Sequence, residues 1–173
     1  PPSVPITSPA LKELFERAEI KILDVGARGG PQTQWLALAP FTHLYLVEPD
    51  AKEAKRLEDN LKAEGGWRNV TVIKEALGSQ EGEATLNLTR YPGLSSLYEP
   101  DAKRVKVYFP SSTDFKKESR EAWEVAKRVR VPVITLDEAA LKYGFSDLSL
   151  LKLDTQGTEL DILRSGREKV IPS

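Results

Sequence analysis

Leu23-Asp24-Val25-Gly26-Ala27-Arg28-Gly29-Gly30, followed by Leu46-Val47-Glu48-Pro49-Asp50, is the stretch of sequence that decides the fold. The first segment closes the run 20–25, which is short, mostly apolar and then broken by glycines, as buried parallel strands are. The second closes the run 44–47, which repeats the pattern. Two such strands joined through a glycine turn predict the start of an open parallel sheet.

Capping residues predict where the helices lie. Ser8 before Pro9 starts a leading amphipathic helix. Asp50 with Glu53 predicts a capping box for a helix that ends at Gly65-Gly66. Thr135 with Glu138 predicts a second capping box, for a helix that ends at Gly144. We expect a further helix at the glycine turn after the first strand, with its N-terminus directed inward, and one capped by Thr158 near the end.

Further strands alternate with these helices. We expect them at 70–73, 84–89, 131–134 and 148–154. The strand at 131–134 is compatible with a sheet edge because Pro132 cannot donate to a ladder, and the strand at 148–154 is expected to be buried. The predicted fold class is therefore α/β, with a Rossmann-like, doubly wound, largely parallel sheet.

A segment from about 91 to 130 interrupts this rhythm. It is turn-rich at Tyr91-Pro92-Gly93 and then charged, and Phe115, Ala122, Trp123 and Ala126 are spaced for one helical face. We interpret it as an insertion beside the site within one domain spanning 1–173; a plain surface excursion is the alternative. If its many Lys and Arg side chains face the site, an anionic acceptor would be favoured.

Composition excludes several classes of protein. The chain has 173 residues, a formal net charge of −1 and no cysteine, which excludes disulfides, thiolate metal sites and thiol nucleophiles. One histidine makes a zinc site unusual, so no metal is expected. Near-neutral charge argues against nucleic acid or an anionic membrane as partners. No apolar run approaches the ~20 residues that span a bilayer, so a cytoplasmic location is expected.

The glycine turn and Glu48 together predict a nucleoside cofactor site. In open α/β sheets ligands bind beyond the carboxyl ends of the strands, and an acid about 20 residues after the glycine turn accepts the ribose hydroxyls. Either feature alone is equally well explained as a tight turn or a helix cap. The glycines run G-x-x-G-G, and Arg28 stands where a dinucleotide site would need a second glycine. A side chain there crowds a diphosphate but tolerates S-adenosylmethionine, which has no phosphate.

The sequence resembles the FkbM family of S-adenosylmethionine-dependent methyltransferases, which has the class I fold. The resemblance rests on five short motifs: Asp24-Val25-Gly26-Ala27-Arg28-Gly29-Gly30 (with Arg28 where Asn is usual), Val47-Glu48-Pro49, Ala76-Leu77-Gly78, Ser95-Ser96-Leu97, and Lys152-Leu153-Asp154-Thr155-Gln156-Gly157-Thr158-Glu159. It implies a cofactor site formed by Asp24, Gly26, Ala27, Arg28, Gly30, Glu48, Pro49, Ala76 and Leu77. It implies a substrate side that includes Ser95, Ser96 and Gln156.

Three residues at the last strand end are candidates for catalysis. Asp154 is the candidate base for the acceptor hydroxyl, with a structural cap on the following turn as its alternative role. Lys152 shares a strand face with Asp154 and needs a carboxylate partner, for which Asp154, Glu159 and Asp24 are candidates. Glu159 lies in the first turn of a helix, where a negative charge is favoured on stability grounds alone.

The predicted function is therefore S-adenosylmethionine-dependent O-methylation of a small-molecule or sugar hydroxyl. The alternatives are a non-catalytic binding or interaction module of the same fold and, third, a nicotinamide-dependent oxidoreductase. Class I methyltransferases usually carry three more strands than this sequence predicts, so we expect the C-terminal part of the sheet to be missing. The exposed edge would then be covered by that missing segment or by a homo-oligomer.

Overall fold

The protein is built on a four-stranded, all-parallel sheet with helices on both faces. The computed structural model describes residues 6–108 and 114–171. The sheet has the order β3-β2-β1-β7, and its strands are β1 (Ile20–Val25), β2 (Thr42–Val47), β3 (Asn69–Ile73) and β7 (Leu150–Leu153). The strand order reverses at β1, which has β2 on one side and β7 on the other. The predicted fold class is confirmed.

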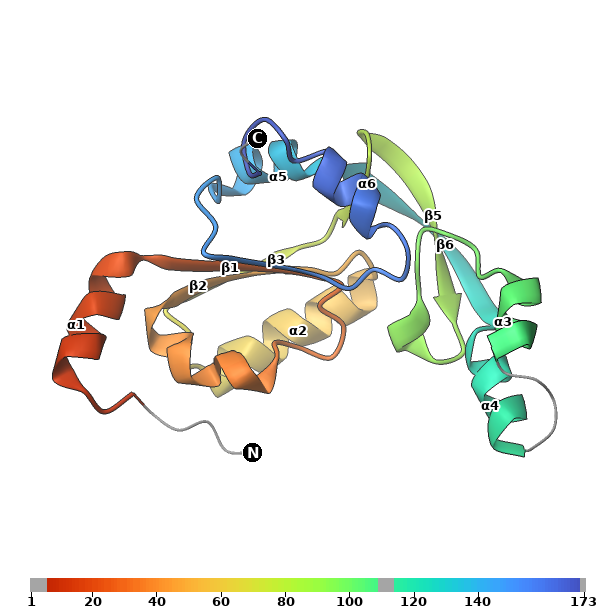
Figure 1. Ribbon diagram of the computed structural model, residues 1–173, viewed down its shortest axis with the longest axis horizontal. Helices are drawn as coiled ribbons and strands as arrows, with labels where there is room; N and C mark the ends of the chain where they lie inside the picture. Colours follow the sequence, from red (N-terminus) through yellow and green to blue (C-terminus); the bar gives the residue numbers. More distant parts are fainter. Residues whose placement is uncertain (1–5, 109–113, 172–173) are drawn as a thin grey trace.

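Helices cover the two faces of this sheet (Figure 1). The 3-10 helix η1 (Thr33–Phe41) and α2 (Ala51–Glu64) lie on one face, and α5 (Leu136–Tyr143) and α6 (Glu159–Arg164) lie on the other. The leading helix α1 (Pro9–Ala18) precedes β1 and is capped by the Ser8 hydroxyl as predicted.

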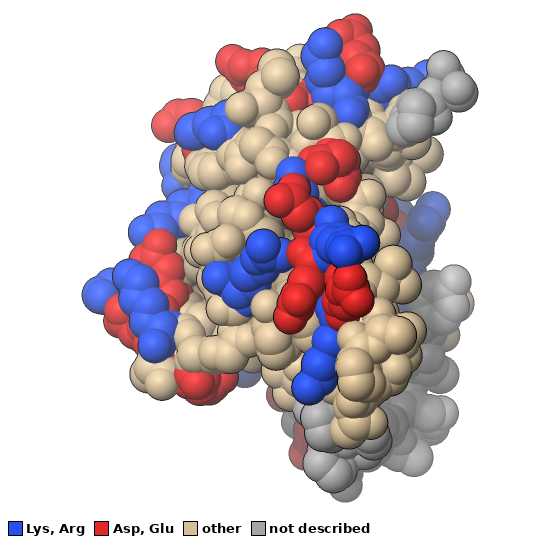
Figure 2. All heavy atoms as spheres, turned by 90° about the vertical axis from the view of Figure 1, so that its left-hand side faces the viewer, with Lys and Arg blue, Asp and Glu red and all other residues tan. Residues whose placement is uncertain are grey.

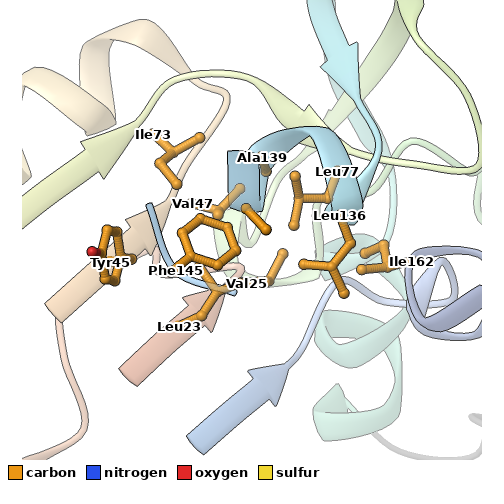
Figure 3. Packing of buried hydrophobic residues seen from close by; sticks show 11 residues of the cluster. Leu23, Val25, Tyr45, Val47, Ile73, Leu77, Leu136, Ala139, Phe145 and Ile162 are labelled. Atoms are coloured by element: carbon orange, nitrogen blue, oxygen red, sulfur yellow. The ribbon is translucent and has the colours of Figure 1, made fainter. Parts of the chain in front are cut away.

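Alternation along β1 supplies both cores, since successive side chains of a strand point to opposite faces. Leu23 and Val25 pack with Leu136 and Ile162 of α5 and α6 (Figure 3). Ile22 packs on the other face, among residues of η1 and α2. The same alternation turns Asp24, which is fully buried, toward the η1 and α2 face.

A smaller sheet stands beyond the carboxyl ends of β1 and β2 (Figure 1). Its order is β4-β6-β5, formed by β4 (Ala76–Leu77), β5 (Gly82–Thr89) and β6 (Val125–Ile134), with β5 and β6 antiparallel. The strand at 131–134 does not lie at a sheet edge, because β6 is the middle strand. Pro132 is tolerated there because β4 is only two residues long and pairs with Val133 and Ile134, leaving Pro132 opposite β5 alone.

The segment between β5 and β6 forms η2 (Pro92–Leu94), α3 (Ala102–Tyr108) and α4 (Asp114–Ala122). The predicted helical face is wrong in part. Trp123 follows the end of α4, and Ala126 lies in β6, because the strand pairing with β5 reaches back to Val125. The side chain of Phe115 lies outside the described part of the structure.

Local capping agrees with the sequence at α5 and differs elsewhere. Thr135 and Glu138 form the predicted capping box, and Gly144 ends α5 with a φ of 75°. The capping box predicted for α2 is wrong: Asp50 caps the helix, but Glu53 accepts from the Gly29 N–H and pairs with Arg56 instead of reaching back.

Three further expectations at the helix and strand ends are corrected. The helix expected after the glycine turn is the 3-10 helix η1, which contains Pro40 and has no side-chain cap. Thr158 lies at the N-cap of α6, but its hydroxyl donates to Thr155 Oγ1 and makes no cap hydrogen bond. β7 is half-buried rather than buried, because it lies at one end of the sheet order.

The surface at the amino ends of the strands carries acidic and basic side chains intermixed (Figure 2). Among the described residues, no helix has the length and apolar character needed to cross a membrane.

Candidate functional site

Three strand ends of the main sheet converge on one cavity. Gly26 follows β1, Glu48 follows β2 and Asp154 follows β7, and all three line the cavity. β4, β5 and the η2 region close it from the other side. The lining residues are Val25, Gly26, Arg28, Val47, Glu48, Pro49, Ala76, Leu77, Leu86, Pro92, Gly93, Ser95, Ser96, Leu97, Asp154, Thr155 and Thr158. The cavity lies beside the reversal of strand order, where open α/β sheets bind ligands.

Gly26 is required by the close approach of two strand ends. Its φ is +82°, and a Cβ built there would lie 2.0 Å from the carbonyl oxygen of Asp154. The Gly26 and Ala27 N–H groups donate to the Val47 carbonyl, and the Asp154 N–H donates to the Val25 carbonyl. These bonds join the glycine turn to the ends of both neighbouring strands. Gly29 and Gly30 also have positive φ, as the tight turn predicted.

Glu48 is a buried carboxylate at the end of β2. It is 4% exposed, its Oε1 accepts from the Asp50 N–H at 2.9 Å, and its Oε2 lies 3.7 Å from Arg28 Nε. Burial raises the pKa of Glu48 to about 7, although the Asp50 hydrogen bond and the Arg28 charge act in the opposite direction. Glu48 is therefore an acceptor whose charge changes near neutral pH.

Arg28 connects the glycine turn to the acids after β2. Its Nη2 lies 2.7 Å from Asp50 Oδ2, and its side chain is mostly buried. Because the guanidinium is committed to Asp50 and lies near Glu48, it fills part of the cavity wall with a neutralised charge. A diphosphate would have to compete with both carboxylates for it.

A partly buried ion pair joins β1 to β7. Lys152 Nζ lies 2.9 Å from Asp24 Oδ1 and 3.7 Å from Asp154 Oδ2. The carboxylate partner expected for Lys152 is thus confirmed, with Asp24 nearer than Asp154. Burial raises the pKa of Asp24, opposed by the hydrogen bond and charge of Lys152. Within the described residues, Asp24 Oδ2 is buried and has no hydrogen-bond partner.

The loop after β7 is held in shape by Glu159. Its carboxylate accepts from the Thr155 N–H at 2.8 Å and from the Gly157 N–H at 2.9 Å. Burial alone would raise the pKa of Glu159, but these backbone N–H groups hold it below its ordinary value. Gln156 has a φ of +59°, and its amide donates to Asp154 Oδ1 at 3.0 Å. Glu159 therefore acts on the loop from behind and does not line the cavity.

Two serines from the η2 region complete the wall. The hydroxyl oxygen of Ser95 accepts from the Thr89 N–H, and that of Ser96 accepts from the Tyr98 N–H. Each hydroxyl can still donate its proton to a ligand. The structure thus brings together nine of the residues singled out from the sequence: Gly26, Arg28, Glu48, Pro49, Ala76, Leu77, Ser95, Ser96 and Asp154.

Other candidates lie behind the wall. Asp24, Ala27, Gly30, Lys152, Gln156 and Glu159 are not among the residues that line this cavity. Sequence reasoning did not assign Leu86 or Pro92-Gly93 to the site, and it named Leu97 only as part of the Ser95-Ser96-Leu97 motif. Leu86 and Leu97 add apolar wall, and Pro92-Gly93 closes one end. The Tyr91-Pro92-Gly93 turn directly before the two serines was the available signal. In the part of the chain that the structure describes, no cluster of three or more His, Cys, Asp or Glu residues could hold a metal ion.

The parallel sheet, its helical layers and the cavity at the strand reversal form a Rossmann-like α/β fold, consistent with that of methyltransferases. The sequence matches the family described as "Methyltransferase FkbM domain" over residues 24–172, and the chain belongs to this family.

One curated relative is similar over most of the chain. It is "2-O-methyltransferase NoeI" of Sinorhizobium fredii (strain NBRC 101917 / NGR234), 24% identical over 157 residues. The match covers 90% of this chain but 60% of the relative, so the chain spans under two thirds of that protein's length. No solved structure matches the sequence significantly.

Proposed function

We propose that the chain binds S-adenosylmethionine in the cavity at the strand ends and transfers its methyl group to a hydroxyl of a small molecule or sugar. The observation that carries the proposal is the convergence of Gly26, Glu48 and Asp154 on one cavity beside the strand reversal. The name of the relative as a 2-O-methyltransferase supports oxygen as the acceptor atom.

The residues present fit this cofactor. Glu48 is a buried carboxylate able to accept both ribose hydroxyls. Ala76 and Leu77 offer an apolar edge for the adenine. Asp24 Oδ2, buried beside the glycine turn with no hydrogen-bond partner among the described residues, is suited to accept from the cofactor's ammonium group through a water. Gly26 lets the glycine turn pass this close to the end of β7, since a Cβ there would lie 2.0 Å from the Asp154 carbonyl oxygen.

Asp154 is the group that would receive the proton of the acceptor hydroxyl. When bound, the cofactor supplies a methyl group on a positively charged sulfur, which becomes a neutral thioether as the methyl–oxygen bond forms. Asp154 lines the cavity with an exposed carboxylate, oriented by the Gln156 amide on Oδ1 and by Lys152 on the side of Oδ2. Lys152 and Glu159 act through this geometry, one on the carboxylate and the other on the loop.

Calorimetric titration of the protein with S-adenosylmethionine and S-adenosylhomocysteine tests the cofactor assignment. We expect both to bind and Glu48→Ala to weaken them at least about tenfold, the value of roughly one good hydrogen-bonded contact. Glu64→Ala is the matched control, because it removes an exposed carboxylate at the far end of α2. Equal affinity in the wild type and Glu48→Ala would contradict the ribose assignment, and binding of NAD alone would favour the oxidoreductase.

Turnover tests the enzyme assignment separately. S-adenosylhomocysteine should accumulate when the protein is incubated with S-adenosylmethionine and hydroxylated acceptors, and Asp154→Asn should slow it strongly with cofactor affinity unchanged. Cofactor binding with no turnover on any hydroxyl would favour the binding-module alternative.

A further inference from the structure

A second cavity lies next to the proposed cofactor cavity. It has a volume of about 600 Å³, within the range of small-molecule sites. Ser96 lines both cavities, and Gln156, which donates to Asp154 in the first cavity, lines the second. An acceptor in the second cavity would therefore meet the proposed base at their shared border.

Two aromatic side chains form part of this cavity. Tyr98 packs over the backbone of Gly157, where its Cδ2 lies 3.3 Å from the place a Cβ would occupy, and its hydroxyl donates to the Asp161 carboxylate. Trp123 is half-buried at the junction of α4 and β6. The negative face of an aromatic ring attracts the weakly positive C–H face of a saturated ring. Such a wall suits a carbohydrate ring.

The charges at this cavity are paired rather than free. Arg104, the one cation among the described lining residues, lies 3.5 Å from Asp101, and Glu99 is bonded at 2.6 Å by Arg128 from outside the lining. These described lining residues thus include two carboxylates and one cation. A phosphate or carboxylate on the acceptor would find no unpaired cation among the described lining residues, because Arg104 already lies beside Asp101.

We propose that this cavity holds the methyl acceptor as an uncharged, polyhydroxylated ring, such as a glycosyl unit without phosphate or carboxylate. The proposal rests on the proposed function for the identity of the reaction, but the binding site stands on its own lining. The ring lies against Trp123, Glu99 accepts from its hydroxyls, and one hydroxyl reaches Asp154 past Gln156. This differs from the anionic acceptor that the basic residues of 91–130 would favour if they faced the site.

Ligand-observed NMR with sugar probes tests the site without requiring turnover. The probes are neutral methyl glycosides, glucuronic acid and glucose 6-phosphate at equal concentration. We expect the neutral glycosides to bind and the two anionic probes to bind at least about tenfold more weakly, because an anion would lose water on entering the cavity without gaining a cationic partner. Equal or tighter binding of the anionic probes, or no binding by any probe, would overturn the proposal.

Variants locate the binding. Trp123→Ala and Trp123→Leu, the second keeping apolar bulk, should each reduce glycoside binding about tenfold or more while S-adenosylhomocysteine affinity, measured by calorimetry, stays constant. Tyr91→Ala is the matched control, since Tyr91 is 62% exposed and lines neither cavity. Glycoside affinity unchanged in both Trp123 variants would refute the placement.

The two proposals fail in different ways. If the cofactor proposal is wrong, S-adenosylhomocysteine will not bind, while the neutral glycosides will still bind and their binding will still depend on Trp123. Loss of the acceptor proposal would appear as intact cofactor binding with no preference for neutral rings.

Discussion

Glu48→Gln should make the protein more stable at alkaline pH and weaken its hold on the cofactor. The wild-type side chain is 4% exposed, and burial raises its pKa from 4.5 to about 7. The glutamine keeps an oxygen that can accept from the Asp50 N–H but cannot ionise. The substitution therefore removes the cost of a buried charge while leaving the local hydrogen bond in place.

The size of the effect follows from the two pKa values. Between 4.5 and about 7 the unfolded chain ionises Glu48 while the folded protein keeps it protonated, so folding loses stability as pH rises through this range. The difference between the two pKa values corresponds to a loss of roughly 3 kcal/mol in the free energy of unfolding. This loss is absent below about pH 4 and complete above about pH 8. All other ionisable groups are shared by the two proteins and cancel in the comparison.

Urea unfolding of the wild type and Glu48→Gln at pH 4 and pH 8 measures this difference directly. The free energy of unfolding of the variant, relative to the wild type, should rise by roughly 3 kcal/mol between the two pH values. Glu64 is an exposed carboxylate at the end of α2, so Glu64→Gln should show no such change in the free energy of unfolding. If the difference in free energy of unfolding between variant and wild type is the same at both pH values, ionisation of Glu48 does not destabilise the folded protein and the reasoning is refuted.

The same group should make cofactor binding depend on pH. If the ionised form accepts the ribose hydroxyls, the competent fraction rises about tenfold between pH 6 and pH 8 for a pKa of about 7. Affinity for S-adenosylhomocysteine should rise by a similar factor in the wild type and stay flat in Glu48→Gln. If the affinity of both proteins is independent of pH, the ionised Glu48 carboxylate does not contact the ligand.

Three further substitutions test the framework of the site. Gly26→Ala should cost at least about 3 kcal/mol and abolish cofactor binding, because its Cβ would lie 2.0 Å from the Asp154 carbonyl oxygen at a φ of +82°; a thermal melt close to that of the wild type would contradict this. Lys152→Met should cost about 3–5 kcal/mol by leaving Asp24 charged and unpaired. This loss should be larger at pH 8 than at pH 4, since burial raises the pKa of Asp24, and Asp24→Asn in the same chain should restore most of it in urea unfolding. Thr135→Ala should cost about 1 kcal/mol by removing the capping box, with cofactor affinity unchanged in calorimetry.

The main sheet was predictable because each of its strands is marked locally. Runs such as 20–25 and 44–47 are mostly apolar and are followed within two residues by a glycine or a proline, and the predicted cofactor residues follow them directly. The carboxyl ends of parallel strands must meet at one edge. Glu48 and Asp154, 106 positions apart in the numbering, could therefore be placed at one site without any contact information.

The smaller sheet was not predictable in the same way. The middle position of β6 depends on a two-residue strand, β4, which is too short to leave a periodic signal. The hydrogen-bond partners of the Glu53 side chain could not be predicted either, since its spacing from Asp50 fits a capping box equally well. The carboxylate turns to the Gly29 N–H and to Arg56 because the glycine turn comes within reach only after the sheet has formed.

Arg28 explains how this site differs from a dinucleotide site and why the pKa of Glu48 stays raised. Its guanidinium bonds Asp50 and lies 3.7 Å from Glu48. The positive charge at the glycine turn is therefore paired with the two acids after β2 and is not available to a phosphate. The pairing is still too distant to offset the burial of Glu48, whose pKa stays near 7. Ribose hydroxyls donating to the ionised form would lower that pKa, and by linkage the cofactor would then release a proton as it binds near neutral pH. A closer Arg28–Glu48 pair would fix the charge of Glu48 but would compete with the ribose for its oxygens, so the observed 3.7 Å separation leaves the carboxylate available to a ligand without a phosphate.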